Sequence, residues 1–254
     1  YCLITGNYWA FTLTDGALRM LVVLYFHQLG YSPLGIALLF VFYEIFGVIT
    51  NAVGGWLGAR LGLNKTMNIG LGLQIAALAM LLVPTSFLSI GWVMASQALS
   101  GVAKDLNKMS AKSSVKILLQ SNSDKNSATE NKLYRWVALL TGSKNALKGV
   151  GFFLGAWLLA ALEFQGAVAT MALSLTLVWI LSLIYLKKDL GKAKNKPKFS
   201  QIFSNSRAIN YLSAARLFLF SARDIWFVIA LPVFLSQLGW SAAAVGSFMA
   251  CWVI

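Results

Sequence analysis

Long apolar runs constrain the fold of this chain more than any other feature of its sequence. Examples are "IGLGLQIAALAMLLV" at 69–83 and "GAVATMALSLTLVWILSLIYL" at 166–186. Helical runs of about 20 apolar residues match the thickness of a bilayer's hydrocarbon core. Only 11% of the 254 residues are charged, against about 25% in soluble domains, and the mean hydropathy is +0.71. The sequence therefore predicts an all-α integral membrane protein.

The hydropathy pattern predicts seven complete membrane spans and part of an eighth. Lys and Arg are missing from the connections after spans one, three, five and seven, and they gather in the connections after spans two, four and six. Because cytoplasmic loops collect basic residues, this alternation predicts a cytoplasmic N-terminus and explains the net charge of +13 without a nucleic-acid partner. The expected spans are 3–29, 34–58, 67–87, 89–109, 136–162, 166–186, 211–238 and 242 to the last residue.

The last part of the chain repeats the first. The segment "YFHQLGYS" at 25–32 is matched by "FLSQLGWS" at 234–241, an offset of 209 positions, and the same offset places Asp15 on Asp224. Both copies are expected to run from the cytoplasm to the exterior, so one repeat unit contains six spans. Parallel six-span repeats are a property of the two halves of major facilitator transporters. We therefore expect a major facilitator fold.

This fold predicts how the chain is divided. Residues 1–186 would form the N-terminal six-helix bundle, 187–210 a basic cytoplasmic central loop, and 211–254 the start of the C-terminal bundle, with helix 7 and part of helix 8. Because the chain stops inside an apolar run soon after the second copy begins, we expect an intact protein of about 400 residues with twelve helices.

The connection after the second span supports the same fold. The segment "GGWLGARLGLNKT" resembles the major facilitator signature between helices two and three, which Gly55, Arg60 and Gly62 fit. Ala59 stands where that signature usually has Asp. We therefore do not carry over to this chain the cytoplasmic gate contact that the Asp makes in relatives.

Charged side chains inside the predicted spans are candidates for a transport pathway, because a charge in hydrocarbon is costly without a partner. Asp15 and Arg19 lie four residues apart, so they share a helix face and can pair. This spacing fits a self-neutralising structural pair as well as a pathway site. Glu44 is a further acid in mid-span and has no partner nearby in the sequence.

Basic residues outnumber acidic ones at these positions. The basic residues are Arg19, Lys104, Lys108, Lys144, Lys148, Arg216 and Arg223, and the acidic ones are Asp15, Glu44, Asp105 and Asp224. This excess predicts an anion cavity, since guanidinium and ammonium groups bind phosphate and carboxylate oxygens. We expect Arg19 and Arg223 to contact the anion, Lys104, Lys108, Lys144 and Lys148 to line its path, and the four acids to be coupling or cavity groups.

The sequence contains no pattern typical of a catalytic, metal or cofactor site. His27 is placed at the external end of the first span, and Cys2 and Cys251 lie in apolar segments without metal-ligand spacing. A transporter of a small organic anion is therefore favoured, and no cofactor is expected. The alternative from another class is a non-transporting membrane receptor or an intramembrane enzyme.

Several longer strings resemble one particular family. The segments "TDGALRMLVVLYFHQLGYSPLGIALLF", "ALSGVAKDLNKMSAKSSVK", "LTGSKNALKGVGFFLGA" and "SAARLFLFSARDIWFV" are similar to ArsJ-type organoarsenical efflux permeases of the major facilitator superfamily. This resemblance implies a bacterial inner-membrane exporter of 1-arseno-3-phosphoglycerate that confers arsenate resistance. It also implies a functional link to a glyceraldehyde-3-phosphate dehydrogenase. The positive charges alone fit another phosphorylated or carboxylated anion equally well.

Overall fold

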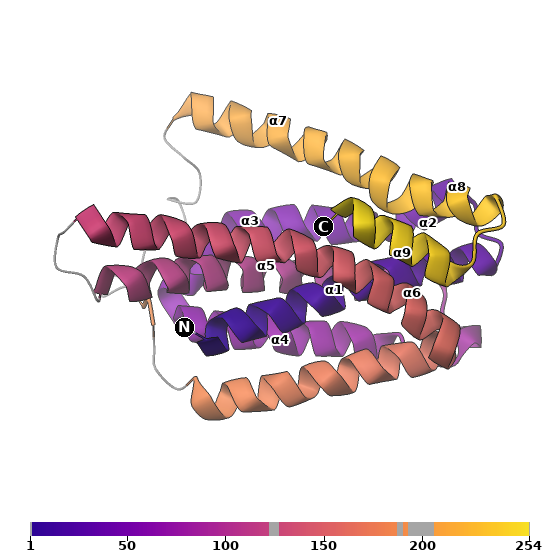
Figure 1. Cartoon of the computed structure of the whole chain (residues 1–254), viewed down its shortest axis with the longest axis horizontal. Coiled ribbons are helices and arrows are strands. Elements are labelled where there is room, and N and C mark those ends of the chain that lie inside the picture. Colours follow the sequence, from indigo (N-terminus) through magenta and orange to yellow (C-terminus); the bar gives the residue numbers. More distant parts are fainter. Residues whose placement is uncertain (1, 122–126, 187–189, 193–205, 254) are drawn as a thin grey trace.

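A computed structural model of the chain describes residues 2–121, 127–186, 190–192 and 206–253, and within these ranges every regular element is a helix. The helices pack side by side along one long axis (Figure 1). In chain order they are α1 (Cys2–Gln28), α2 (Pro33–Leu39), α3 (Val41–Leu61), α4 (Leu63–Met80), the short η1 (Thr85–Phe87), α5 (Ile90–Ser121), α6 (Ser127–Tyr185), α7 (Arg207–Asp224), η3 (Ile225–Ala230), α8 (Leu231–Gln237) and α9 (Ala242–Val253).

These helices correspond to the predicted spans, with three differences. The second span is divided at Phe40 into α2 and α3. The fifth and sixth spans are the two arms of α6, which reverses at Glu163, where φ is 56°. The seventh span contains a π-helical turn, η3, between α7 and α8. Pro232 is the second residue after this turn and has no N–H to donate, so the wider turn occurs where the regular hydrogen-bond ladder is interrupted.

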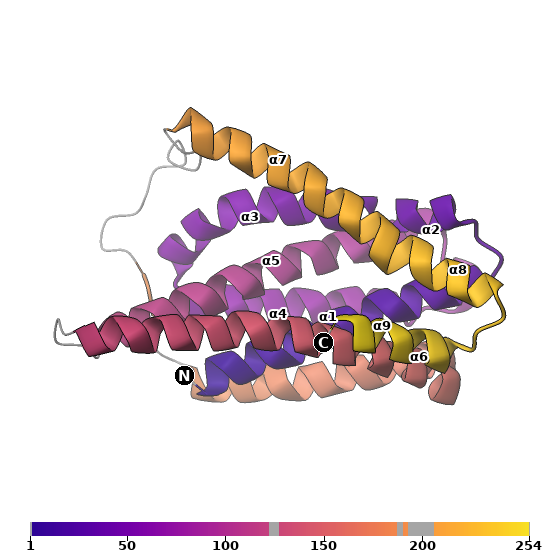
Figure 2. The ribbon, with the colours of Figure 1, turned by 45° about the horizontal axis from the view of Figure 1, so that its top comes forward.

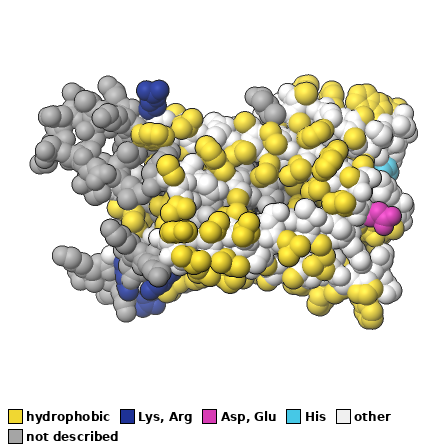
Figure 3. Space-filling view, turned by 60° about the horizontal axis from the view of Figure 1, so that its bottom comes forward, with side chains coloured by type: hydrophobic (Ala, Val, Ile, Leu, Met, Phe, Trp, Pro, Cys, Tyr) yellow, Lys and Arg dark blue, Asp and Glu magenta, His cyan; other side chains and the backbone are white. Residues whose placement is uncertain are grey.

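The surface fits a protein surrounded by lipid. Within the described residues, three stretches are long and apolar enough to cross a membrane: Cys2–Gln28, Pro33–Asn51 and Ala138–Tyr185, of which the last includes the reversal in α6. Figure 3 shows a largely hydrophobic face with Lys and Arg side chains at one end of the molecule. Helices α4 and α5 are more polar because they bury side chains such as Gln74, Ser100 and Asn107 against each other.

The predicted repeat is present as two turns with the same hydrogen bonds. Gly30 and Gly239 both have positive φ values, 85° and 86°. Ser32 and Ser241 both begin the next helix, and each hydroxyl accepts a bond from a backbone N–H three residues later. The matching backbone bonds are Gly30 N to His27 O at 2.9 Å with Gly239 N to Ser236 O at 3.0 Å, and Tyr31 N to Phe26 O at 3.1 Å with Trp240 N to Leu235 O at 3.2 Å.

The second copy joins the first bundle at one end of the molecule. There η3 and α8 contact α1, η3 contacts α2, and α9 packs along α6. Helix α7 diverges from the bundle toward the opposite end, as both ribbon views show (Figures 1 and 2). The end at which they diverge is the end that the basic connections predict to be cytoplasmic. Most of the predicted central loop 187–210 lies outside the described residues, so the division of the chain into 1–186, 187–210 and 211–254 stays a prediction.

Candidate functional site

Arg19 is the centre of a charged cluster formed by helices from both copies. Its side chain is buried in α1, at 3% exposure. Nη1 donates to Oδ2 of Asp224 in α7 at 3.1 Å, and Nη2 donates to Oε1 of Glu44 in α3. Glu44 therefore has the partner that its sequence neighbourhood lacks. The cluster joins the first bundle to the second copy through one guanidinium.

Asp15 does not form the ion pair with Arg19 that their spacing would allow. Its Oδ1 accepts a hydrogen bond of 2.6 Å from the hydroxyl of Tyr43, and Arg19 makes its salt bridges with Glu44 and Asp224. The spacing left a direct pair and a pathway site both open, because sharing a helix face only makes a contact possible. The neighbouring helices supply better-placed partners for both side chains.

Tyr43 is a member of the cluster that the sequence analysis missed. Its ring centroid lies 4.2 Å from Arg19 Cζ and 4.0 Å from Lys104 Nζ, so two cations rest against one aromatic ring. Lys104 Nζ also lies 3.8 Å from Oε2 of Glu44. The only sequence signal for Tyr43 is its position beside the sole acid of its span.

Glycines bring the helices of this cluster into close contact. A Cβ on Gly101 in α5 would lie 2.2 Å from the carbonyl oxygen of Tyr43, and one on Gly155 in α6 would lie 2.1 Å from that of Ala17. Gly16, next to Asp15, approaches Lys148 in the same way. Small residues at such crossings let helix backbones approach closely in membranes. These crossings therefore fix where Arg19 and Tyr43 lie.

Lysines extend the cluster toward the predicted cytoplasmic end. Lys108 is 3.1 Å from Asp105 Oδ1, one turn along α5 from Lys104. Lys148 in α6 lies 5.6 Å from the ring centroid of Phe152. Within the described part of the chain, neither Lys144 nor Lys148 has a carboxylate within 4.0 Å. These two lysines therefore add positive charge beside the cluster without a direct ion pair of their own.

The predicted residues of α7 differ in their placement. The Arg223 side chain is 59% exposed, and its Nη2 donates to Oδ1 of Asp224 at 2.7 Å. Asp224 is therefore shared between Arg223 and Arg19. Arg216 lies on the exposed part of α7, two turns nearer the predicted cytoplasmic end. The structure thus gathers Asp224 and Arg223 around Arg19 and leaves Arg216 apart.

The signature residues after the second span lie at the predicted cytoplasmic end. Gly62 forms the sharp junction between α3 and α4. Its φ is 94°, a value that a residue with a side chain rarely adopts. Arg60 Cζ lies 4.9 Å from the ring centroid of Trp56. Leu63 N donates to Leu190 O at 2.8 Å, so this junction also contacts the segment after α6. Gly55 lies one turn before Arg60 in α3, with open space where a Cβ would be.

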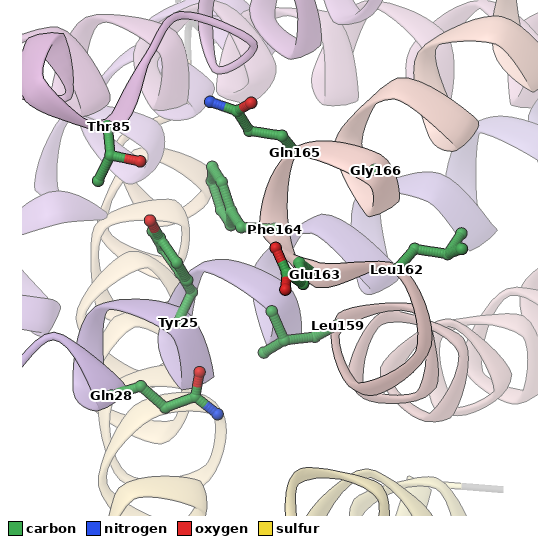
Figure 4. A pocket seen from close by; sticks show the side chains of 9 residues that line it. All are labelled: Tyr25, Gln28, Thr85, Leu159, Leu162, Glu163, Phe164, Gln165 and Gly166. Atoms are coloured by element: carbon green, nitrogen blue, oxygen red, sulfur yellow. The ribbon is translucent and has the colours of Figure 1, made fainter.

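A separate pocket of about 420 Å³ lies at the opposite end of the molecule, where α6 reverses (Figure 4). Tyr25 and Phe164 stack in it, with centroids 4.0 Å apart, beside Glu163 and Gln165. The pocket contains none of the predicted site residues. Within the described ranges there is also no group of His, Cys, Asp or Glu side chains that could hold a metal ion.

Comparisons with known proteins agree on one fold. The family model described as Major Facilitator Superfamily matches residues 4–254. No curated protein sequence matches the chain. A bacterial homologue of the human drug peptide transporters PepT1 and PepT2 is 19% identical, with a TM-score of 0.61 over 94% of this chain and 53% of its own. Tetrameric PepTSo2 is 17% identical, with a TM-score of 0.62 over 94% and 51%.

A peptide transporter POT in complex with sulfate is 19% identical, with a TM-score of 0.54 over 97% of this chain and 47% of its own. The chain therefore spans about half the length of the solved transporters that it resembles. At 17–19% identity, the similarity to these transporters shows a shared fold.

Proposed function

This chain belongs to the major facilitator superfamily of membrane transporters, and we propose that the solute it carries is an organic anion. The family assignment indicates a multi-pass secondary transporter and not an enzyme. The anion is our inference from the charged cluster. Arg19 is expected to bind it together with Arg223 and Lys104, and the lysines at 108, 144 and 148 are expected to line its cytoplasmic approach.

The observation that carries this proposal is the burial of Arg19 together with the hydrogen-bonding of its guanidinium. It is buried at the meeting point of three helices, and among the residues that the structure describes its Nε is enclosed without a hydrogen-bond partner. A guanidinium binds oxyanions through several N–H groups at once, so a free donor beside two occupied ones fits an incoming phosphate or carboxylate. Lys148 adds a positive charge from α6, whose backbone at this residue is in close contact with Gly16 of α1.

The resemblance to ArsJ-type permeases suggests the substrate within this class. We propose 1-arseno-3-phosphoglycerate, exported across a bacterial inner membrane with the N-terminus in the cytoplasm. The compound would be supplied by a glyceraldehyde-3-phosphate dehydrogenase that uses arsenate in place of phosphate, and its export would give arsenate resistance. Its phosphate and arsenate oxygens fit a site built from a guanidinium and lysines.

The membrane potential is sufficient to drive such an export. Moving one charge through 100 mV is worth about 2.3 kcal/mol, so an anion with about three negative charges gains roughly 7 kcal/mol on leaving a negative interior. This corresponds to a concentration ratio of about 10⁵, since 1.4 kcal/mol is tenfold. We therefore propose electrogenic export without a coupled proton.

Vesicles containing the full-length protein test these points. Vesicles loaded with labelled 3-phosphoglycerate test the anion class, and vesicles enclosing the dehydrogenase with arsenate, NAD and glyceraldehyde 3-phosphate test the arsenical.

Arg19→Gln should abolish export while the protein still inserts into the membrane. Export should stop when the membrane potential is collapsed. It should continue when only the pH gradient is collapsed. Export that depends on the pH gradient alone would contradict electrogenic transport, and normal export by Arg19→Gln would contradict the site.

A further inference from the structure

We infer that Glu44 is a resident competitor for the anion site. Its carboxylate occupies the space between Arg19 and Lys104 when substrate is absent, and the anionic group of the substrate displaces it. This inference rests on the proposed function. It gives Glu44 a defined role in substrate affinity and release, which a general cavity acid would not have.

The first argument is that Glu44 makes the contacts that a bound oxyanion would make. Its Oε1 accepts a hydrogen bond from Arg19, and its Oε2 lies 3.8 Å from Lys104 Nζ. One carboxylate therefore spans two cations from two different helices. A phosphate or carboxylate group presents an equivalent pair of oxygens, so it would compete for the same two partners.

The second argument is that both cations are held independently of Glu44. The ring of Tyr43 lies against Arg19 and Lys104, and it is buried at 1% exposure. Its hydroxyl is bonded to Asp15, and its backbone is in close contact with Gly101. These cation–π contacts do not involve the Glu44 carboxylate, and Arg19 also keeps its hydrogen bond to Asp224. The two cations therefore stay in place for the incoming anion.

The third argument separates Glu44 from the other acid on Arg19. Asp224 is also bonded by Arg223, through Nε at 3.0 Å and Nη2 at 2.7 Å, and its side chain is 19% exposed. The Glu44 side chain is 33% exposed, and among the described residues its only guanidinium partner is Arg19. Glu44 is therefore the carboxylate that is free to move toward solvent, while Asp224 keeps a partner on its own helix.

Competition of this kind has a direct kinetic consequence. The empty site never leaves its buried cations without a counter-charge, since Glu44 is present whenever the substrate is not. Each binding event exchanges one carboxylate for another anion, and the return of Glu44 helps the substrate to leave. Removing the charge at residue 44 should therefore tighten binding and slow release.

Equilibrium binding of labelled 3-phosphoglycerate to the full-length protein tests the inference. Glu44→Gln should lower the Kd roughly tenfold, the change expected when one hydrogen-bonded charged competitor is removed. In vesicles the same variant should lower the KM for export, and it should also lower kcat because release becomes slower. A residue with a merely structural role would not tighten binding.

Two further variants make the test specific. Asp105→Asn removes a negative charge one turn from Lys104, beside Lys108, and should change the Kd much less than Glu44→Gln. Glu44→Asp keeps the charge but shortens the side chain, so it should span the two cations less well and tighten binding by a smaller factor. If Glu44→Gln does not insert into the membrane, Glu44→Asp carries the test.

The possible failures are distinguishable. If the wild-type protein binds 3-phosphoglycerate but neither Glu44 variant binds it more tightly, the inference is overturned and the proposed function stands. Equal tightening by Asp105→Asn would also overturn the inference, because it would show a general effect of charge. If the wild type and both Glu44 variants bind no 3-phosphoglycerate, the anion function fails and the inference fails with it.

Discussion

Helix α1 and its copy, which is formed by α7, η3 and α8, end in the same turn but differ around the acid that they share. Asp15 in the first copy is buried and bonded to a tyrosine hydroxyl, whereas Asp224 in the second is bonded by two arginines. The residue after the acid is Gly16 in the first copy and Ile225 in the second. The first copy is a regular helix there, and the second is π-helical.

The difference teaches that a repeat preserves what local sequence determines and varies what neighbours determine. The turn recurs because Gly30 and Gly239 adopt the same positive φ and the following serines cap the next helix in the same way. The acids differ because their surroundings differ. Asp15 lies inside a bundle, at a close crossing with α6, whereas Asp224 lies at the junction between the bundle and the diverging α7.

The largest expected effect comes from exchanging the residue after each acid. Gly16→Ile should destabilise the protein by about 3 kcal/mol, because overpacking a tight crossing forces helices apart. A Cβ at Gly16 would already lie 2.9 Å from the carbonyl oxygen of Lys148. The reciprocal change Ile225→Gly affects a side chain that is 51% exposed and should cost about 1 kcal/mol, the cost of glycine in a helix. Unfolding titrations in detergent micelles measure both values, and equal losses would contradict the difference between the copies.

A smaller effect is expected from neutralising each acid in turn. Asp224→Asn should cost about 2 kcal/mol of unfolding free energy, because it weakens charge-assisted bonds to two arginines. Asp15→Asn should cost less than about 1 kcal/mol, because the amide oxygen can still accept the bond from the Tyr43 hydroxyl. The same unfolding titration compares them. A greater loss for Asp15→Asn would show that Asp15 supports Arg19 more than its observed contacts indicate.

The smallest difference between the two copies is expected at their turns. Gly30→Ala and Gly239→Ala each place a side chain at a positive φ with open space around it, so each should cost about 1 kcal/mol from backbone strain alone. The double variant should lose the sum of the two, since distant sites are additive. Unequal or non-additive losses would mean that the two turns are not equivalent in energy.

The sequence by itself determined the helical membrane fold and the repeat. Apolar runs of span length, basic connections and a recurring glycine turn are local features, and the family model agrees with the fold that they predict. The sequence also determined which side chains were candidates for a site, since charged residues in apolar spans stand out. Their assigned roles, the substrate and the direction of transport stay predictions.

Only the tertiary structure decided which of these side chains meet. Arg19 pairs with Glu44, 25 residues away, and with Asp224, 205 residues away, instead of with Asp15 on its own helix. Tyr43 joins the cluster without any charge to mark it in the sequence. The physical reason is that contacts between helices depend on how the helices cross. In this protein those crossings are set by close glycine contacts, such as Gly101 with Tyr43 and Gly155 with Ala17, between residues far apart in the chain.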